Sequence, residues 1–244
     1  AEPTATQPAA TQPGPAPRLD RLVEKIEAGG TITIVMYGDS ISEVGRSPKW
    51  HGGASVPDHN WGSLLRDRFA ERFPETTFEL KFFSIGGQNA YEGLGRLDWL
   101  WEHEPDLVVV AFGTNDLWHH EIPPYATERA LSELIEKVTD KADVVVVSTA
   151  GNNPIDPRFQ HTDQTVVATG SAAKKHRVPF VNMRRPILDV TEGGKRWDEY
   201  HLFPKNCHPN DAGHAVWAKV TWQVIERALV APKGSDSSGG GANR

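Results

Sequence analysis

Short apolar runs alternate along the chain with longer segments whose apolar residues recur at helical spacing. The runs predict five β-strands, at residues 31–37, 77–85, 106–112, 143–148 and 178–182. The segments around them predict helices at residues 18–29, 61–73, 90–103, 125–140, 160–176 and 211–229. Strands that alternate with helices indicate βαβ units and a parallel sheet. We therefore expect an α/β protein, a three-layer α/β/α sandwich with a flavodoxin-like strand order of 2-1-3-4-5.

The composition changes at both ends of the chain. Residues 1–17 are mainly Pro, Ala, Thr and Gln, and residues 232–244 are rich in Gly and Ser. Neither segment has the apolar side chains needed to offset the entropy of ordering, so we expect a disordered tether and a disordered tail. A single catalytic domain is expected between them, at residues 18–231, and this length suits one hydrophobic core.

Charge and hydropathy narrow the range of partners. The formal net charge is −6, and this mild acidic excess argues against a nucleic-acid partner. No apolar run approaches the roughly 20 residues that span a bilayer. The chain begins at Ala1 with a Pro-rich segment, as is common after a signal peptide has been removed, so we expect a secreted or periplasmic protein. The one cysteine, Cys207, excludes an intrachain disulfide.

A candidate nucleophile follows the first predicted strand, in the sequence Gly38-Asp39-Ser40. The carboxyl ends of parallel strands converge on one crevice, where ligands bind. A serine there, at the start of a helix, would lie in a positive potential that favours a developing anion. The simpler alternative is that Asp39 or Ser40 only caps a helix.

Three further segments lie at comparable places. Gly86-Gly87 follows the second predicted strand, Gly113-Thr114-Asn115-Asp116 follows the third, and His208-Pro209-Asn210 precedes the last helix. Taken singly, the glycines could form an ordinary turn, and Asn115 could form an Asx turn. Taken in order, the segments indicate a nucleophile, oxyanion donors and a base that meet at one edge of the sheet.

These four segments resemble the sequence blocks of the GDSL (SGNH) hydrolases, from about residue 33 to residue 214. The resemblance implies a flavodoxin-like fold and the hydrolysis of esters or thioesters. It implies that Ser40 is the nucleophile and that His208 is first the general base and then the general acid. It places the oxyanion hole at the backbone N–H groups of Ser40 and Gly87, with Gly86 as the neighbouring alternative, and at the side-chain amide of Asn115.

The chain departs from the family pattern at Lys205, because the family usually has Asp three residues before the histidine. Lysine cannot accept a hydrogen bond from imidazole, so we expect Lys205 to point to solvent. The preferred alternative is a Ser–His dyad in which a backbone carbonyl orients His208. The other two are an acid from elsewhere, such as Asp198, and a weakly catalytic relative. Cys207 is expected to face away from His208 and to be a small buried residue.

Several tryptophans fall in predicted loops or at their edges: Trp50, Trp61, Trp118 and Trp197. Indole rings stack on the apolar faces of sugars, so Trp50 and Trp118 are candidates for a carbohydrate subsite. The pair His119-His120 with Asp116 matches no zinc pattern, and we expect neither a metal nor another cofactor. Arg184-Arg185 is expected to be a solvated pair.

Together these features predict a serine esterase that removes short acyl groups, acetyl foremost, from an acylated small molecule or polysaccharide. One alternative is a lipase or thioesterase, which would need a sheltered apolar groove that the polar loop at residues 41–60 does not suggest. The other is a glycan-binding relative with little turnover, which the lysine at position 205 would favour.

Overall fold

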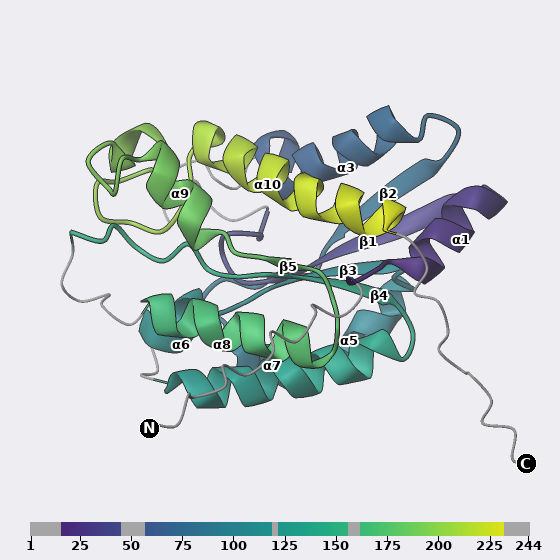
Figure 1. Ribbon diagram of the computed structural model, residues 1–244, viewed down its shortest axis with the longest axis horizontal. Helices are drawn as coiled ribbons and strands as arrows, with labels where there is room; N and C mark the ends of the chain where they lie inside the picture. Colours follow the sequence, from purple (N-terminus) through teal and green to yellow (C-terminus); the bar gives the residue numbers. More distant parts are fainter. Residues whose placement is uncertain (1–15, 45–56, 119–121, 156–161, 232–244) are drawn as a thin grey trace, which may run out of the picture.

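A five-stranded parallel sheet forms the centre of the protein. The computed structural model describes residues 16–44, 57–118, 122–155 and 162–231 (Figure 1). The strand order is β2-β1-β3-β4-β5, which confirms the predicted α/β class and the flavodoxin-like order. The strands are β1 (Thr31–Gly38), β2 (Thr77–Phe82), β3 (Leu107–Ala111), β4 (Asp143–Val147) and β5 (Phe180–Val181).

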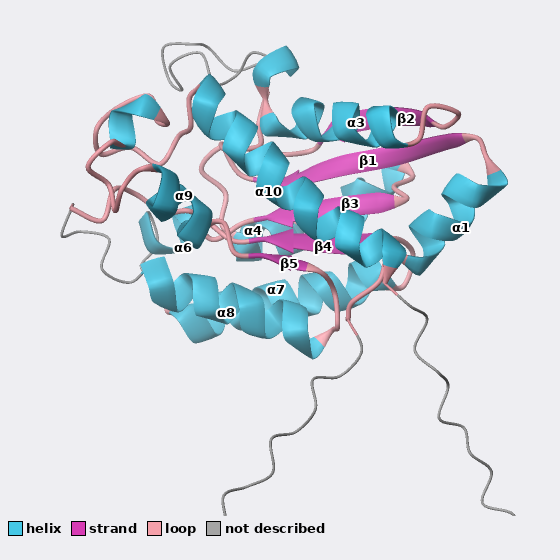
Figure 2. Ribbon diagram, turned by 45° about the horizontal axis from the view of Figure 1, so that its top comes forward, coloured by secondary structure: helices cyan, strands magenta, loops and turns pink. Residues whose placement is uncertain are grey.

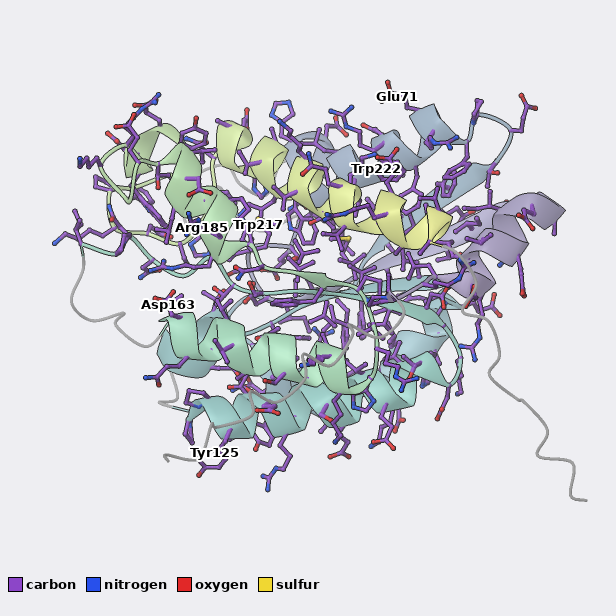
Figure 3. The ribbon with its side chains drawn as sticks, in the orientation of Figure 1. Glu71, Tyr125, Asp163, Arg185, Trp217 and Trp222 are labelled. Atoms are coloured by element: carbon purple, nitrogen blue, oxygen red, sulfur yellow. The ribbon has the colours of Figure 1, made fainter. Side chains whose placement is uncertain are left out.

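Two layers of helices cover the sheet (Figures 1 and 2). One face carries α1 (Asp20–Ala28), α3 (Trp61–Arg72), α9 (Arg184–Val190) and α10 (Asp211–Val230). The other face carries α4 (Ala90–Gly95), α5 (Leu97–Leu100), α7 (Pro124–Thr139) and α8 (Thr162–Lys175), and the short α6 (Thr114–Trp118) follows β3. Glu71 on α3 and Tyr125 on α7 lie on the outer surfaces of opposite layers (Figure 3).

The central strand β1 joins the two cores. Its even-numbered residues Ile32, Ile34 and Met36 pack into the core beneath α3 and α10, and its odd-numbered residues Val35 and Tyr37 pack into the core beneath α4 and α7. All five side chains are fully buried. Because helices cover both faces of the sheet, its central strands are mainly apolar, and β3 is apolar throughout, which is why the sequence pattern located them.

The prediction of a single helix at residues 90–103 is wrong. The structure ends α4 at Gly95, starts α5 at Leu97 and finishes with a 3-10 turn, Trp101–His103. Arg96 lies at the break, where its buried guanidinium stands 4.4 Å from the ring centroids of both Tyr37 and Phe83. Because arginine is polar, the pattern of apolar residues does not reveal that Arg96 is buried or that the helix breaks there. Within the described residues, the helices α6 and α9 were also not predicted.

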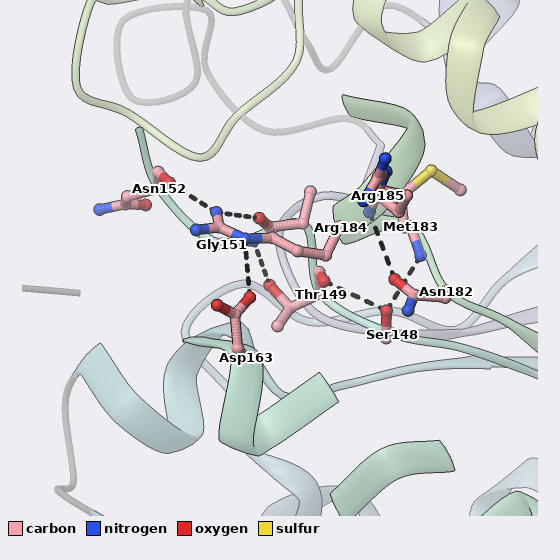
Figure 4. A network of polar contacts seen from close by, with 10 residues as sticks. Ser148, Thr149, Gly151, Asn152, Asp163, Asn182, Met183, Arg184 and Arg185 are labelled. Atoms are coloured by element: carbon pink, nitrogen blue, oxygen red, sulfur yellow. Dashed lines mark hydrogen bonds and ion pairs between the residues drawn. The ribbon is translucent and has the colours of Figure 1, made fainter. Parts of the chain in front are cut away.

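The expectation of a solvated arginine pair is wrong for Arg184. Its side chain is 8 % exposed and donates to the backbone oxygens of Ala150 at 2.8 Å and Asn152 at 2.9 Å (Figure 4). It also pairs with Asp163 at 3.3 Å. Burial lowers the pKa of Arg184, and the charge of Asp163 opposes that shift. Arg184 thus ties α9 to α8 and to the loop after β4, whereas Arg185 remains exposed.

Two predicted loop tryptophans belong to the core. Trp61 and Trp197 are fully buried, and the ring of Trp61 lies 5.5 Å from that of Trp217. Trp217 lies on the side of α10 that faces the sheet (Figure 3). Trp61 and Trp197 therefore pack the layer that holds α10.

Two glycines of α4 offer a matched test of how tightly this helix packs. A Cβ atom on Gly93 would lie 2.5 Å from the ring of the buried Phe112, whereas a Cβ on Gly95 would meet nothing within 4 Å. We expect Gly93→Ala to lower the free energy of unfolding by about 1–3 kcal/mol through overpacking. Gly95→Ala should leave it unchanged or raise it slightly, since alanine favours helix. Urea denaturation measures both, and equal stabilities would contradict the packing described here.

Candidate active site

Ser40 and His208 meet at the carboxyl end of the sheet. Ser40 follows β1 and His208 precedes α10, and both of these ends lie at the left of the molecule in Figure 1. Although 168 positions separate them in the sequence, Ser40 Oγ lies 2.8 Å from His208 Nε2. Ser40 is 7 % exposed. The two predicted residues therefore form a hydrogen-bonded alcohol–imidazole pair.

The turn that carries Ser40 is fixed by close contact between β1 and β3. A Cβ atom on Gly38 would lie 2.4 Å from the backbone oxygen of Ala111, so only glycine fits here. The Asp39 carboxyl then accepts from the N–H of Ile41 at 3.0 Å. The structure has Ser40 in a turn at residues 40–42, so the expectation that Ser40 starts a helix is wrong.

Asp39, beside the serine, is buried in an acidic setting. Its side chain is 2 % exposed, and burial raises its pKa to about 7. The N–H of Ile41 and the hydroxyl of Thr114 oppose this shift, whereas the charges of Asp116 and Glu43 add to it. Near neutral pH this buried carboxyl is therefore divided between its protonated and ionised forms.

The second and third blocks hold each other in place. Asn115 Nδ2 donates to the backbone oxygen of Gln88 at 3.0 Å. The carboxylate of Asp116 accepts from the N–H of Ala90, at 3.2 Å to the nearer oxygen, and from the hydroxyl of Thr127 at 2.9 Å. Asn115 and Asp116 thus fix the loop that leads into α4.

Gly87 carries the special backbone conformation of that loop. Its φ angle is +83°, a region that glycine adopts without strain, whereas Gly86 has no positive φ. The loop joins the nucleophile turn through the N–H of Ile85, which donates to the oxygen of Gly38 at 3.0 Å. Asn115, 5 % exposed, lies on its other side. The backbone conformation thus distinguishes Gly87 from its neighbour.

A side chain that the sequence analysis missed orients His208. His208 Nδ1 lies 2.5 Å from Asn206 Oδ1, and the backbone N–H of His208 donates to the same oxygen at 2.7 Å. Because a backbone N–H can only donate, the atom facing it is the amide oxygen, and Nδ1 must carry the ring hydrogen. Nε2 is then free of hydrogen and accepts from the hydroxyl of Ser40.

Asn206 therefore takes the place that the sequence analysis gave to a backbone carbonyl or to Asp198. Asp198 is exposed on the 3-10 turn Trp197–Glu199, and Lys205 is exposed, as expected for a side chain that cannot accept a hydrogen bond. The available signal was local: asparagine commonly accepts from the N–H two residues further on.

The loop of Asn206 rests on a buried aromatic pair. Trp197 Nε1 donates to the backbone oxygen of Asn206 at 2.6 Å. The Trp197 ring stacks on that of His201, with centroids 3.8 Å apart and planes 5° apart. Burial lowers the pKa of His201 to about 4, so this imidazole stays neutral at neutral pH.

Two neighbours of His208 are also held uncharged. Cys207 Sγ lies 3.8 Å from His208 Nδ1, so the expectation that the thiol faces away is wrong. Burial raises the pKa of this thiol to about 12, which leaves it without nucleophilic character. His214 Nδ1 accepts from the N–H of Trp61 at 3.3 Å. Burial, together with the charges of nearby histidines, lowers the pKa of His214 to about 3.

The candidate sugar subsite falls outside the part of the chain that the structure describes. Trp50 and the pair His119-His120 lie outside the described residues, as does the side chain of Trp118 at the end of α6. Among the residues that the structure describes, no group of three or more His, Cys, Asp or Glu could hold a metal ion. Within the same part of the chain, no helix has the length and apolarity to cross a bilayer.

A serine–imidazole pair at the carboxyl edge of a flavodoxin-like sheet defines the class of the serine hydrolases of SGNH type. Residues 36–216 match the model of the GDSL-like Lipase/Acylhydrolase family, and the chain belongs to this family.

Known relatives agree with this assignment. An arylesterase of Vibrio mimicus is 32 % identical over 116 residues, which are 47 % of this chain and 52 % of the relative, so the match spans about half of that protein. A two-domain esterase active on acetylated mannans shares 23 % identity with a TM-score of 0.69, over 88 % of this chain and 54 % of the other. Axe2, an acetylxylan esterase from Geobacillus stearothermophilus, shares 19 % identity with a TM-score of 0.66, over 84 % of this chain and 99 % of Axe2. At these identities the structural likeness shows the fold.

The buried carboxyl of Asp39 predicts a pH dependence of stability. Its pKa in the folded state, about 7, is above its value in the unfolded chain, so the folded protein holds the extra proton between these values. The free energy of unfolding should therefore fall as the pH rises from about 4 to about 7, by up to about 4 kcal/mol, and then level off.

Asp39→Asn tests this, because the neutral amide cannot ionise. Relative to this variant, the wild type should lose stability over that pH range in urea denaturation. The exposed Asp98→Asn is the matched control and should follow the wild type. Parallel curves for the wild type and Asp39→Asn would show that the carboxyl does not titrate in the fold.

Proposed function

We propose that this chain is a serine esterase that hydrolyses short acyl esters, acetyl foremost, on a carbohydrate. The observation that carries the proposal is the 2.8 Å contact between Ser40 Oγ and His208 Nε2, at the edge of the sheet where the Gly87 loop and Asn115 also lie. A nucleophile, a base in the correct tautomer and amide donors are the groups that acyl transfer requires.

In the first half of the reaction, the hydroxyl of Ser40 gives its proton to His208 Nε2 as Oγ forms a bond to the ester carbon. The carbonyl π bond opens, and its electrons become a negative charge on oxygen. When the carbonyl re-forms, the bond to the alcohol breaks, and that alcohol takes the proton from Nε2. The acyl group is then bonded to Ser40.

In the second half, water replaces the alcohol. Water gives one proton to His208 Nε2 while its oxygen bonds to the acyl carbon. The second tetrahedral intermediate collapses, the bond to Ser40 Oγ breaks, and Oγ takes the proton back from Nε2. The products are the free alcohol and the carboxylic acid, and the enzyme returns to its starting state.

The negative oxygen would be held by three donors: the N–H groups of Ser40 and Gly87 and the side chain of Asn115. The amide of Asn115 has two hydrogens, and the oxygen of Gln88 uses one of them. The other would donate to the negative oxygen of the substrate. Because the first contact fixes the amide, little reorganisation is needed when the charge develops.

The choice of substrate rests on the structural neighbours. One is active on acetylated mannans and another is an acetylxylan esterase, and both share the fold of this chain. An acylated polysaccharide is therefore the preferred substrate. Such a substrate lies outside the cell or in the periplasm, so a secreted or periplasmic location belongs to the same proposal.

Acyl-chain preference separates this proposal from its rivals. We expect faster turnover of p-nitrophenyl acetate than of the octanoate, together with release of acetate from acetylated xylan or mannan. Ser40→Ala should lower kcat/KM by on the order of 10⁴-fold or more. Preference for octanoate would indicate a lipase or thioesterase, and wild-type turnover equal to that of Ser40→Ala would contradict an acyl-enzyme on Ser40.

Removal of one oxyanion donor should affect the chemical step. We expect Asn115→Ala to lower kcat by about 10²–10³-fold with a much smaller change in KM. Steady-state kinetics measure both constants. The exposed Asn182→Ala provides a control on another loop and should behave as the wild type. A variant Asn115→Ala that retains full kcat would exclude this amide from the oxyanion hole.

A further inference from the structure

We propose that Asn206 is the positioning residue of a Ser–His–Asn triad, in which a neutral amide holds the imidazole of His208. The proposal rests on the proposed function for the roles of Ser40 and His208. It goes beyond that function because it assigns the third member of the triad. It also states what this member does: it orients the imidazole without adding a negative charge.

The contact has the geometry of an Asx turn in which the side-chain oxygen also accepts a hydrogen bond from the imidazole ring. One oxygen, Asn206 Oδ1, accepts from the backbone N–H of His208 at 2.7 Å and from its ring Nδ1 at 2.5 Å. The first bond fixes the orientation of the amide, since only oxygen can accept there. The second bond then fixes both the tautomer and the rotation of the ring.

The backbone around Asn206 is anchored on both sides. Its N–H donates to the oxygen of Phe203 at 3.1 Å, and its own oxygen accepts from Trp197 Nε1 at 2.6 Å. The oxygen of His208 accepts from the N–H of Leu202 at 3.0 Å. Trp197 is fully buried, so the frame that carries the amide belongs to the folded core. Asn206 therefore holds the ring before any substrate arrives.

A neutral acceptor differs from a carboxylate in one measurable respect. Both select the tautomer in which Nε2 can take the proton of Ser40. A carboxylate also stabilises the imidazolium that forms during the attack, and it raises the pKa of the histidine by about 1–3 units. An amide gives the orientation without the charge. Asn206→Asp should therefore raise the pKa of His208, and Asn206→Ala should release the ring.

The other titratable groups near His208 are the same in all of these variants. They come from the nucleophile turn, from α6, from the loop of His208 itself, and from the 3-10 turns and helix α10 packed against it. Among the described residues, those tied to His208 or to its neighbours include the thiol of Cys207, the imidazoles of His59, His201 and His214, and the carboxyls of Asp39, Glu43, Asp116 and Asp211. A shift between the wild type and Asn206→Asp therefore reports the residue at position 206.

The experiment measures the pKa of His208 and the kinetics in parallel. The pKa comes from NMR titration of protein with ¹³C-labelled histidine, with the His208 signal assigned by its absence in His208→Gln. The kinetics are the pH profile of kcat/KM for p-nitrophenyl acetate, whose acidic limb reports the base of the free enzyme. Lys205→Ala, a change at the exposed neighbouring position, is the matched control.

We expect Asn206→Ala to lower kcat by about 10–100-fold with little change in KM, because the ring loses its fixed orientation. Asn206→Asp should raise the pKa of His208 by about 1 unit or more and shift the acidic limb of the profile by the same amount. Lys205→Ala should match the wild type in every measurement. If Asn206→Ala does not fold, as judged by circular dichroism, Asn206→Asp alone decides the proposal.

An unchanged pKa of His208 in Asn206→Asp would overturn the proposal, as would a wild-type kcat in folded Asn206→Ala. The NMR titration needs no turnover, so it tests the role of Asn206 separately from the proposed esterase function. If the pKa shifts in Asn206→Asp while neither the wild type nor any variant hydrolyses an ester, the contact is supported and the proposed esterase function fails.

Discussion

The close contact between β1 and β3 at Gly38 is the constraint on which the rest of the site depends. The backbone of β3 approaches so closely that no side chain fits at this position, and the chain must turn as soon as β1 ends. This turn presents Ser40 above the carboxyl edge of the sheet. The loop after β2 and the helix after β3 leave the sheet beside it, so the parallel register gathers three blocks within one small region.

The sequence was sufficient for the fold because burial on both faces leaves a simple pattern. The central strands are short and mainly apolar, the helices between them are periodic, and the order of elements permits few topologies. The prediction was wrong at positions where a polar side chain is buried in the interior. Arg96 breaks the helix expected at residues 90–103, and Arg184, the first residue of α9, is buried, although arginine ordinarily marks a solvated face. The domain limits at residues 18 and 231 remain predictions.

For the site, order along the chain indicated which residues would meet, but not how the imidazole is oriented. The family pattern points to position 205, where lysine cannot accept a hydrogen bond, so the expected acceptor was a backbone carbonyl or, as an alternative, an acid from elsewhere such as Asp198. The acceptor lies one residue further along, in a turn whose geometry depends on Trp197 and the chain around residue 203. Such a contact needs side-chain placement within a loop, which neither periodicity nor spacing encodes. The roles of Ser40, Gly87, Asn115 and His208 in turnover likewise remain proposals.

The position of the acceptor has a consequence for how such chains are classified. A pattern that demands a carboxylate three residues before the histidine would sort this protein with degenerate homologues, in which the constellation is incomplete. Yet His208 Nδ1 has a hydrogen-bond partner in the side chain of Asn206, at a position that such a pattern does not include. Surveys of sequence collections that score only the aspartate would therefore undercount members whose histidine is supported from the adjacent position.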